Sequence, residues 1–170
     1  MKMTKKVALS TLVAAGATAG LVSGLVKLGW EALLPPRTPE RDATNPPQTF
    51  LQQHGLSYAQ THKTYRYNGH DVPWVSLMLH FGFSSGIGAL YSVTGHYLPF
   101  TKLGNGAAYG LATWAGAHLL AMPTLGIVPT AKDQPMPEHV SEAAGHMVWN
   151  WVNQLTIDQL LIRWGQHEQK

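Results

Sequence analysis

Residues 72–101, VPWVSLMLHFGFSSGIGALYSVTGHYLPFT, contain no Asp, Glu, Lys or Arg, and residues 103–131 contain none either. A hydrocarbon core about 30 Å thick is crossed by roughly 20 apolar residues in a helix, so each stretch is long enough to span a membrane. Residues 7–26 and 143–157 are also free of these charges. The four segments predict an all-α fold, a polytopic bundle of transmembrane helices.

We expect a single membrane domain over residues 1–170, with one ordered extracytoplasmic loop over residues 31–71. The fourth span is interrupted by Asn150, Asn153 and Asp158, so it either lies partly in the membrane interface or is shielded by the other helices. The four expected spans are residues 7–29, 72–94, 103–128 and 139–162.

The composition agrees with a membrane protein. Charged residues make up 12% of the chain, against about 25% in a typical soluble domain. The net charge is +3, but the basic residues are scattered and form no stripe, so the expected partner is the lipid bilayer and not nucleic acid. The absence of cysteine excludes disulfides and thiol catalysis. No motif predicts an enzyme.

Three lysines precede the first span and indicate its orientation. Lys2, Lys5 and Lys6 predict a cytoplasmic N-terminus by the positive-inside rule, and four spans would return the C-terminus to the same side of a bacterial inner membrane. A signal peptide cleaved before Gly20 is the alternative. The apolar pattern continues past that position to Leu28, which favours an uncleaved span.

Small residues recur at helical spacing within the spans. Gly16, Gly20 and Gly24 share one helix face, at which a second helix can approach closely. This face would form either a homo-oligomer contact or a contact with the chain's own helices. The second is favoured because the same spacing recurs at Gly82/Gly86 and Gly106/Gly110.

The outer segment is rich in proline and has two local structure signals. Asn45 is a suitable cap for a short helix that contains Phe50, and Asn68-Gly69 is a turn signal. The loop motif Pro35-Pro36-Arg37 begins the segment and favours extended backbone.

Ionisable residues lie at similar depth in the expected spans, in the outer half of the membrane. Glu142 and His146 are four residues apart on one helix face, as are Lys27 and Glu31. Such groups usually face the bundle interior and one another, because lipid cannot solvate them. The predicted functional cluster consists of Lys27, Glu31, His80, His118, Glu142 and His146.

Three roles are open for this cluster. The histidines could respond to protons, since the ordinary pKa of histidine is near neutral. They could instead be hydrogen-bond partners that hold the helices together, each contributing about 1 kcal/mol. No cofactor is expected unless the third role holds, in which the cluster binds a metal ion, because imidazole and carboxylate groups suit zinc. The candidate ligands are His80, His118, Glu142 and His146.

Two runs resemble signatures of a known family. Residues 25–39, LVKLGWEALLPPRTP, and residues 140–151, VSEAAGHMVWNW, are similar to those of the YagU-like bacterial inner-membrane proteins, a family of unknown function. The outer loop is shorter than in an enteric member and lacks its cysteines. Further similar positions are His70, His80, Tyr91, Lys102, Gly106, Gly110, His118, Pro123, Gly126 and Pro129.

The resemblance implies an inner-membrane location and a link to acid stress, but no mechanism. Together with the residues, it predicts a protein that contributes to acid tolerance or envelope homeostasis through a proton-responsive His/Glu cluster. The alternative is a non-catalytic membrane scaffold or assembly partner in which the polar residues only join helices. A metal-dependent membrane protein is the third hypothesis.

Overall fold

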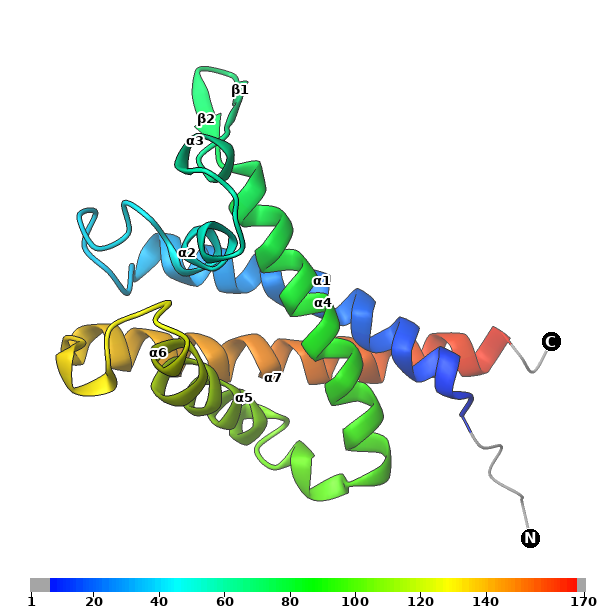
Figure 1. Cartoon of the computed structure of the whole chain (residues 1–170). Coiled ribbons are helices and arrows are strands. Elements are labelled where there is room, and N and C mark those ends of the chain that lie inside the picture. Colours follow the sequence, from blue (N-terminus) through cyan, green and yellow to red (C-terminus); the bar gives the residue numbers. More distant parts are fainter. Residues whose placement is uncertain (1–6, 168–170) are drawn as a thin grey trace, which may run out of the picture.

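The computed structural model describes residues 7–167, and three long helices form its framework (Figure 1). These are α1 (Leu9–Leu33), α4 (Trp74–Tyr97) and α7 (Met136–His167). α1 packs against both α4 and α7. α4 crosses over the other two, and α1 begins at the same end of the bundle at which α7 ends (Figure 1). The three helices occupy three of the four segments in which the sequence predicts spans.

The remaining segment is helical over a shorter stretch than residues 103–128. Asn105 and Gly106 adopt left-handed backbone conformations, with φ of 52° and 86°, so the helix begins only after them. Gly126, with φ of 68°, follows its end. The helical run packs on α7 and consists of α5 (Ala107–Trp114), a π-helical segment (Ala115–Ala121) and α6 (Met122–Thr124).

Glycines allow α1 and α4 to pack in close contact. A Cβ atom on Gly16 would collide with the backbone oxygen of Gly88, and one on Gly20 would collide with that of Ser84. The predicted small-residue face of α1 is therefore used within the chain. A Cβ on Gly82 would meet none of the described residues, so that glycine has no such role within the chain.

Asn150 and Asn153, two of the three polar residues that interrupt the fourth predicted span, lie inside the bundle, whereas Asp158 is exposed. Asn150 and Asn153 are 0% exposed. The Asn150 side-chain amide donates to the backbone oxygen of Gly106 at 2.7 Å, and the Tyr91 hydroxyl donates to Gln154 Oε1 at 2.6 Å. Other helices therefore cover Asn150 and Asn153, while a fourth full span stays a prediction.

The segment between α1 and α4, called the outer segment after its predicted location, carries the two local features expected from its sequence. Asn45 caps α2 (Pro46–Gln53), and Asn68-Gly69 forms the left-handed turn between two short antiparallel strands. The Asn45 side chain also donates to Ser76 Oγ at 3.0 Å, which fixes the start of α2 against α4. The other elements here are α3 (Tyr58–Thr61), β1 (Tyr65–Tyr67) and β2 (His70–Val72).

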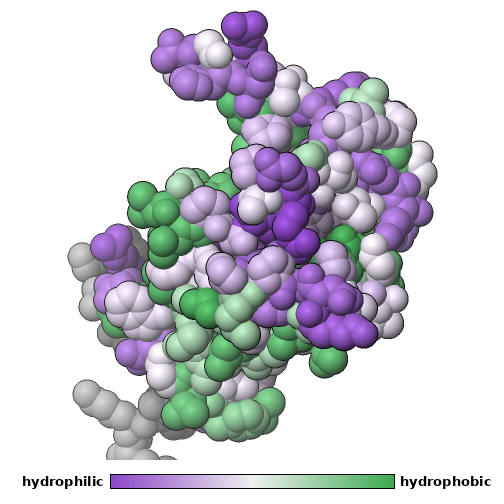
Figure 2. Space-filling view, turned by 90° about the vertical axis from the view of Figure 1, so that its left-hand side faces the viewer, coloured by the Kyte–Doolittle hydropathy of each residue, from purple (hydrophilic) through white to green (hydrophobic). Residues whose placement is uncertain are grey.

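Polar side chains face inward and many large apolar side chains face outward. Among the described residues, buried polar or charged side chains outnumber buried hydrophobic ones, while Leu25, Met78 and Leu120 are more than half exposed. Figure 2 views the end at which α1 finishes, where hydrophilic residues cover the upper and central parts and hydrophobic residues flank them. This distribution suits a bundle surrounded by lipid.

Hydropathy alone identifies one candidate span in the described part of the chain. It is α1, whose most apolar window has a mean hydropathy of 1.7. α4 and α7 contain buried Ser, His and Asn residues, which lower their mean hydropathy while other helices cover these side chains. The four-span topology therefore stays a prediction.

Candidate functional site

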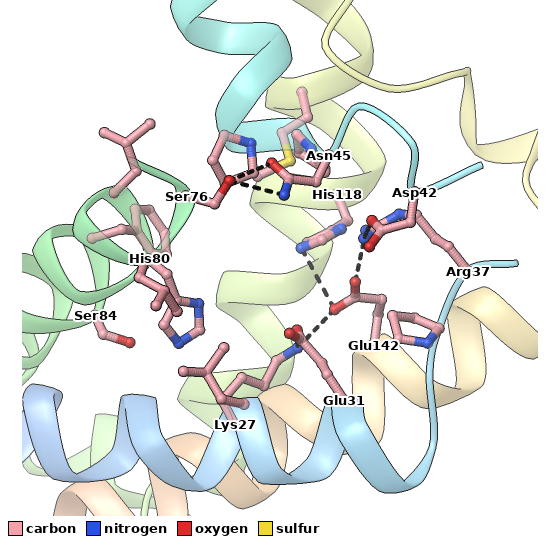
Figure 3. Close-up of a pocket in the computed structure, with 18 of the residues that line it drawn as sticks. Lys27, Glu31, Arg37, Asp42, Asn45, Ser76, His80, Ser84, His118 and Glu142 are labelled. Carbon is pink, nitrogen blue, oxygen red and sulfur yellow. Dashed lines mark hydrogen bonds and ion pairs between the residues drawn. The ribbon is translucent and has the colours of Figure 1, made fainter. Parts of the chain in front are cut away.

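Glu142 is the centre of a buried ion-pair network (Figure 3). Its Oε1 accepts a hydrogen bond from Arg37 Nη2 at 2.7 Å, and its Oε2 accepts one from Lys27 Nζ at 3.0 Å. Lys27 also pairs with Glu31 Oε1 at 2.5 Å, as the spacing along the helix predicts. The Glu142 side chain is 3% exposed, and it joins α1, the outer segment and α7.

A second carboxylate extends the network toward the outer segment. Glu138, one turn before Glu142 on α7, accepts from Arg37 Nε at 3.1 Å and from Arg41 Nη2 at 2.8 Å. Arg37 Nη1 lies 3.6 Å from Asp42 Oδ1. Burial raises the pKa of Asp42, and the charges of Glu31 and Glu142 act in the same direction.

Two histidines contact the same carboxylate. His118 Nε2 lies 3.9 Å and His146 Nδ1 lies 3.6 Å from Glu142 Oε2. Their rings are 5.0 Å apart, inclined at 78°. His146 follows Glu142 by one helical turn, and its Nδ1 donates to the Glu142 backbone oxygen at 2.8 Å. His118 lies on the π-helical segment, an irregularity frequently found at functional sites.

His80 lies apart from these two histidines. Its Nε2 donates to the backbone oxygen of Gly24 at 3.0 Å, so its ring joins α4 to α1. His80 nevertheless lines the same cavity, which measures about 530 Å³ and lies between α1, α4, α7 and the outer segment. All six residues of the predicted cluster line it: Lys27, Glu31, His80, His118, Glu142 and His146.

The loop motif Pro35-Pro36-Arg37, which the sequence predicts as a feature separate from the cluster, also lines this cavity. Pro35 and Pro36 line the cavity, and they bring the chain back so that Arg37 reaches both glutamates of α7. Sequence reasoning missed Glu138, Arg41 and Asp42. The one available signal was the spacing of Glu138, four residues before Glu142 on the same helix face.

The donor set fits a metal ion in geometry but not in charge. Ligand atoms of His118, Glu142 and His146 all lie within 4.8 Å of one another. However, both Glu142 oxygens already pair with the cations of Lys27 and Arg37. A divalent ion would lie beside these cations or displace one of them, and like charges at such distances repel strongly in a medium of low dielectric constant. His80, the fourth predicted ligand, is outside this group.

The fold and the site define a small helical protein with a buried charge cluster near one end. Residues 21–155 match the family described as a protein of unknown function, DUF1440. The chain is 33% identical over 159 residues to the inner membrane protein YagU of Escherichia coli strain K12, covering 80% of this chain and 77% of that protein. The chain therefore belongs to the YagU-like family of membrane proteins, as its motifs indicated. No solved structure matches it significantly.

Proposed function

We propose that this chain is an inner-membrane protein that contributes to acid tolerance or envelope homeostasis through a proton-responsive cluster. The observation that carries the proposal is that His118 and His146 are both buried against Glu142, the carboxylate that also holds Arg37. Histidine is the side chain whose ordinary pKa, about 6.5, lies nearest to neutral pH, so it is the residue type best suited to a response to acid.

The shared carboxylate suggests how protonation would change the structure. A protonated His118 or His146 would compete with Arg37 for Glu142, because one carboxylate can satisfy only a few charged donors. Arg37 joins the outer segment to α7 through Glu142 and Glu138, and Arg41 adds a second contact with Glu138. Loss of the Glu142 contact would loosen the segment that begins at Pro35. The proposed switch thus combines a titrating group with an element whose attachment depends on it.

We further propose that the cluster faces the outside of the inner membrane. α1 begins and α7 ends at the end of the bundle opposite the cluster, in keeping with an even number of spans (Figure 1). Reporter fusions at both termini should be active in the cytoplasm, and a fusion within residues 38–71 should be active outside. Termini on opposite sides, or processing before Gly20, would contradict this topology.

Acid survival separates the proton-linked role from a purely structural one. His146→Gln retains hydrogen-bonding capacity but cannot gain a charge between about pH 5 and 8. The variant should accumulate normally in the membrane and fail to support survival at low external pH. His54→Gln in the exposed outer segment is the matched control and should survive normally. Normal survival of His146→Gln at equal protein levels would exclude the proton-linked role.

A scaffold is the second candidate function. It is favoured by the hydrogen bonds of Asn150, Tyr91 and His80, each of which joins two segments of the bundle. In that role the protein would hold a partner in the membrane without chemistry of its own. A metal-dependent role comes third, because Lys27 and Arg37 oppose a cation at Glu142.

A further inference from the structure

The cavity beside the ion-pair network has more carboxylates than fixed cations. Lys27, Arg37 and Arg41 are paired with four acidic side chains, so one negative charge remains when the histidines are neutral. The acidic side chains are Glu31, Asp42, Glu138 and Glu142.

Two of these carboxylates are incompletely paired and line the cavity. Glu31 uses Oε1 for Lys27, and its Oε2 has no hydrogen-bond partner among the described residues. Within residues 7–167, the Asp42 carboxylate contacts only Arg37, at 3.6 Å, and this side chain is half exposed. Both carboxylates can therefore accept further donors.

Two ring nitrogens also present lone pairs. A backbone carbonyl only accepts hydrogen bonds, so the nitrogens of His80 and His146 that contact Gly24 O and Glu142 O must carry the proton. The other nitrogen of each neutral ring is then an acceptor. His146 is 6% exposed and lines the cavity, and its Nε2 has no partner in residues 7–167. This nitrogen is therefore an acceptor that a ligand in the cavity could use.

The walls around these acceptors are largely apolar and aromatic. Phe50 on α2, Phe83 on α4 and Trp149 on α7 line the cavity together with Leu77 and Met122. Phe50 is 39% exposed and Phe83 is 48% exposed, which places them toward the open side. Aromatic faces attract cations. The volume of about 530 Å³ lies within the range of small-molecule sites.

We propose that this cavity binds a hydrophobic monovalent cation, such as an amphiphilic amine or an onium ion. The surplus carboxylate charge and the unpartnered acceptors select for positive charge, and the aromatic walls accommodate an apolar body. Such a ligand needs only to approach Glu31 and Asp42 and does not have to displace Lys27 from Glu142. This binding activity does not depend on the proton-linked role.

The test uses two probes of almost the same shape and opposite charge. Equilibrium dialysis of the purified full-length protein in detergent at pH 7.5, against protein-free detergent, measures binding of tetraphenylphosphonium and tetraphenylborate. Saturable binding of tetraphenylphosphonium with at least about tenfold preference over tetraphenylborate is expected, since tenfold corresponds to about 1.4 kcal/mol. Equal binding of the two, preference for tetraphenylborate, or no saturable binding overturns the proposal.

Charge-removing variants locate the site. Glu31→Gln and Asp42→Asn should each weaken tetraphenylphosphonium binding about tenfold, and Phe83→Ala should weaken binding of both probes by removing part of the wall. Asp71→Asn in the hairpin, outside the cavity, is the matched control and should bind as the unmodified protein does. If Glu31→Gln does not fold, the affinity of Asp42→Asn for tetraphenylphosphonium alone tests the location of the site. Unchanged affinity in the folded carboxylate variants would overturn the assignment.

Discussion

Glu142→Ala should lower the free energy of unfolding by about 3 to 5 kcal/mol, because it removes the shared partner of two poorly exposed cations. The side chains of Lys27 and Arg37 are 6% and 11% exposed, and in the variant both positive charges would lose the carboxylate that they share. Denaturant unfolding of the purified protein in detergent measures the change. Glu40→Ala, at a fully exposed carboxylate of the outer segment, should change stability little.

A double-mutant cycle identifies the cause of that loss. Lys27→Met combined with Glu142→Gln should lower the free energy of unfolding by clearly less than the sum of the two single changes. In the double variant, neither the Lys27 ammonium group nor the Glu142 carboxylate is left buried without the other. Lys27 has two carboxylate partners, so the cycle with Glu31→Gln should show a smaller coupling. Additive losses in both cycles would mean that these contacts do not stabilise the fold.

Gly20→Val should be the second strongly destabilising change. Its side chain would have to occupy the position of the Ser84 backbone oxygen, and backbone cannot move aside as the end of a flexible side chain can. Overpacking of this kind costs about 1 to 3 kcal/mol, occasionally more, and we expect the upper end of this range because α1 and α4 must separate. Thermal unfolding in detergent measures the cost.

Gly82→Val is the matched control for this substitution. Gly82 is also a helical glycine, but a Cβ there meets none of the described residues. Since valine has a higher helix propensity than glycine, the control should be neutral or slightly stabilising. Equal destabilisation by the two substitutions would show that close contact between α1 and α4 is not what Gly20 provides.

The sequence predicted the long helices because their cause is local. Residues 72–101 contain no charged side chain, and away from water a helix satisfies the backbone hydrogen bonds within the segment itself, so most of this stretch forms α4. The late start of α5 was missed because it depends on the left-handed conformations of Asn105 and Gly106, which composition does not reveal. The Asn45 cap and the Asn68-Gly69 turn were predictable because their signals span only a few residues.

The candidate site was predictable only in part. Helical spacing identified the pairs Lys27/Glu31 and Glu142/His146, and similar depth brought His118 near them. The return of Arg37 to α7 was missed, since it depends on how the outer segment folds over the bundle. Depth alone also could not show that His80 would bond to Gly24 and remain apart from Glu142.

In the proposed switch, protonation of His118 and His146 loosens the segment held by Arg37. The chain has no cysteine, so Thr38→Cys provides a single attachment site for a spin label beside Arg37. Asp42 must be controlled for, because its raised pKa means that it too loses charge, and its pairing with Arg37, as the pH falls. The measurement is therefore repeated with Asp42→Asn.

Electron paramagnetic resonance of this label in proteoliposomes, from pH 7.5 down to about pH 3.5, is the direct measurement, because burial makes a histidine harder to protonate. We expect label mobility to rise on acidification, to rise equally with Asp42→Asn, and to stay constant when His118→Gln and His146→Gln are combined. Mobility that is independent of pH, or that rises equally in the double histidine variant, would contradict the account.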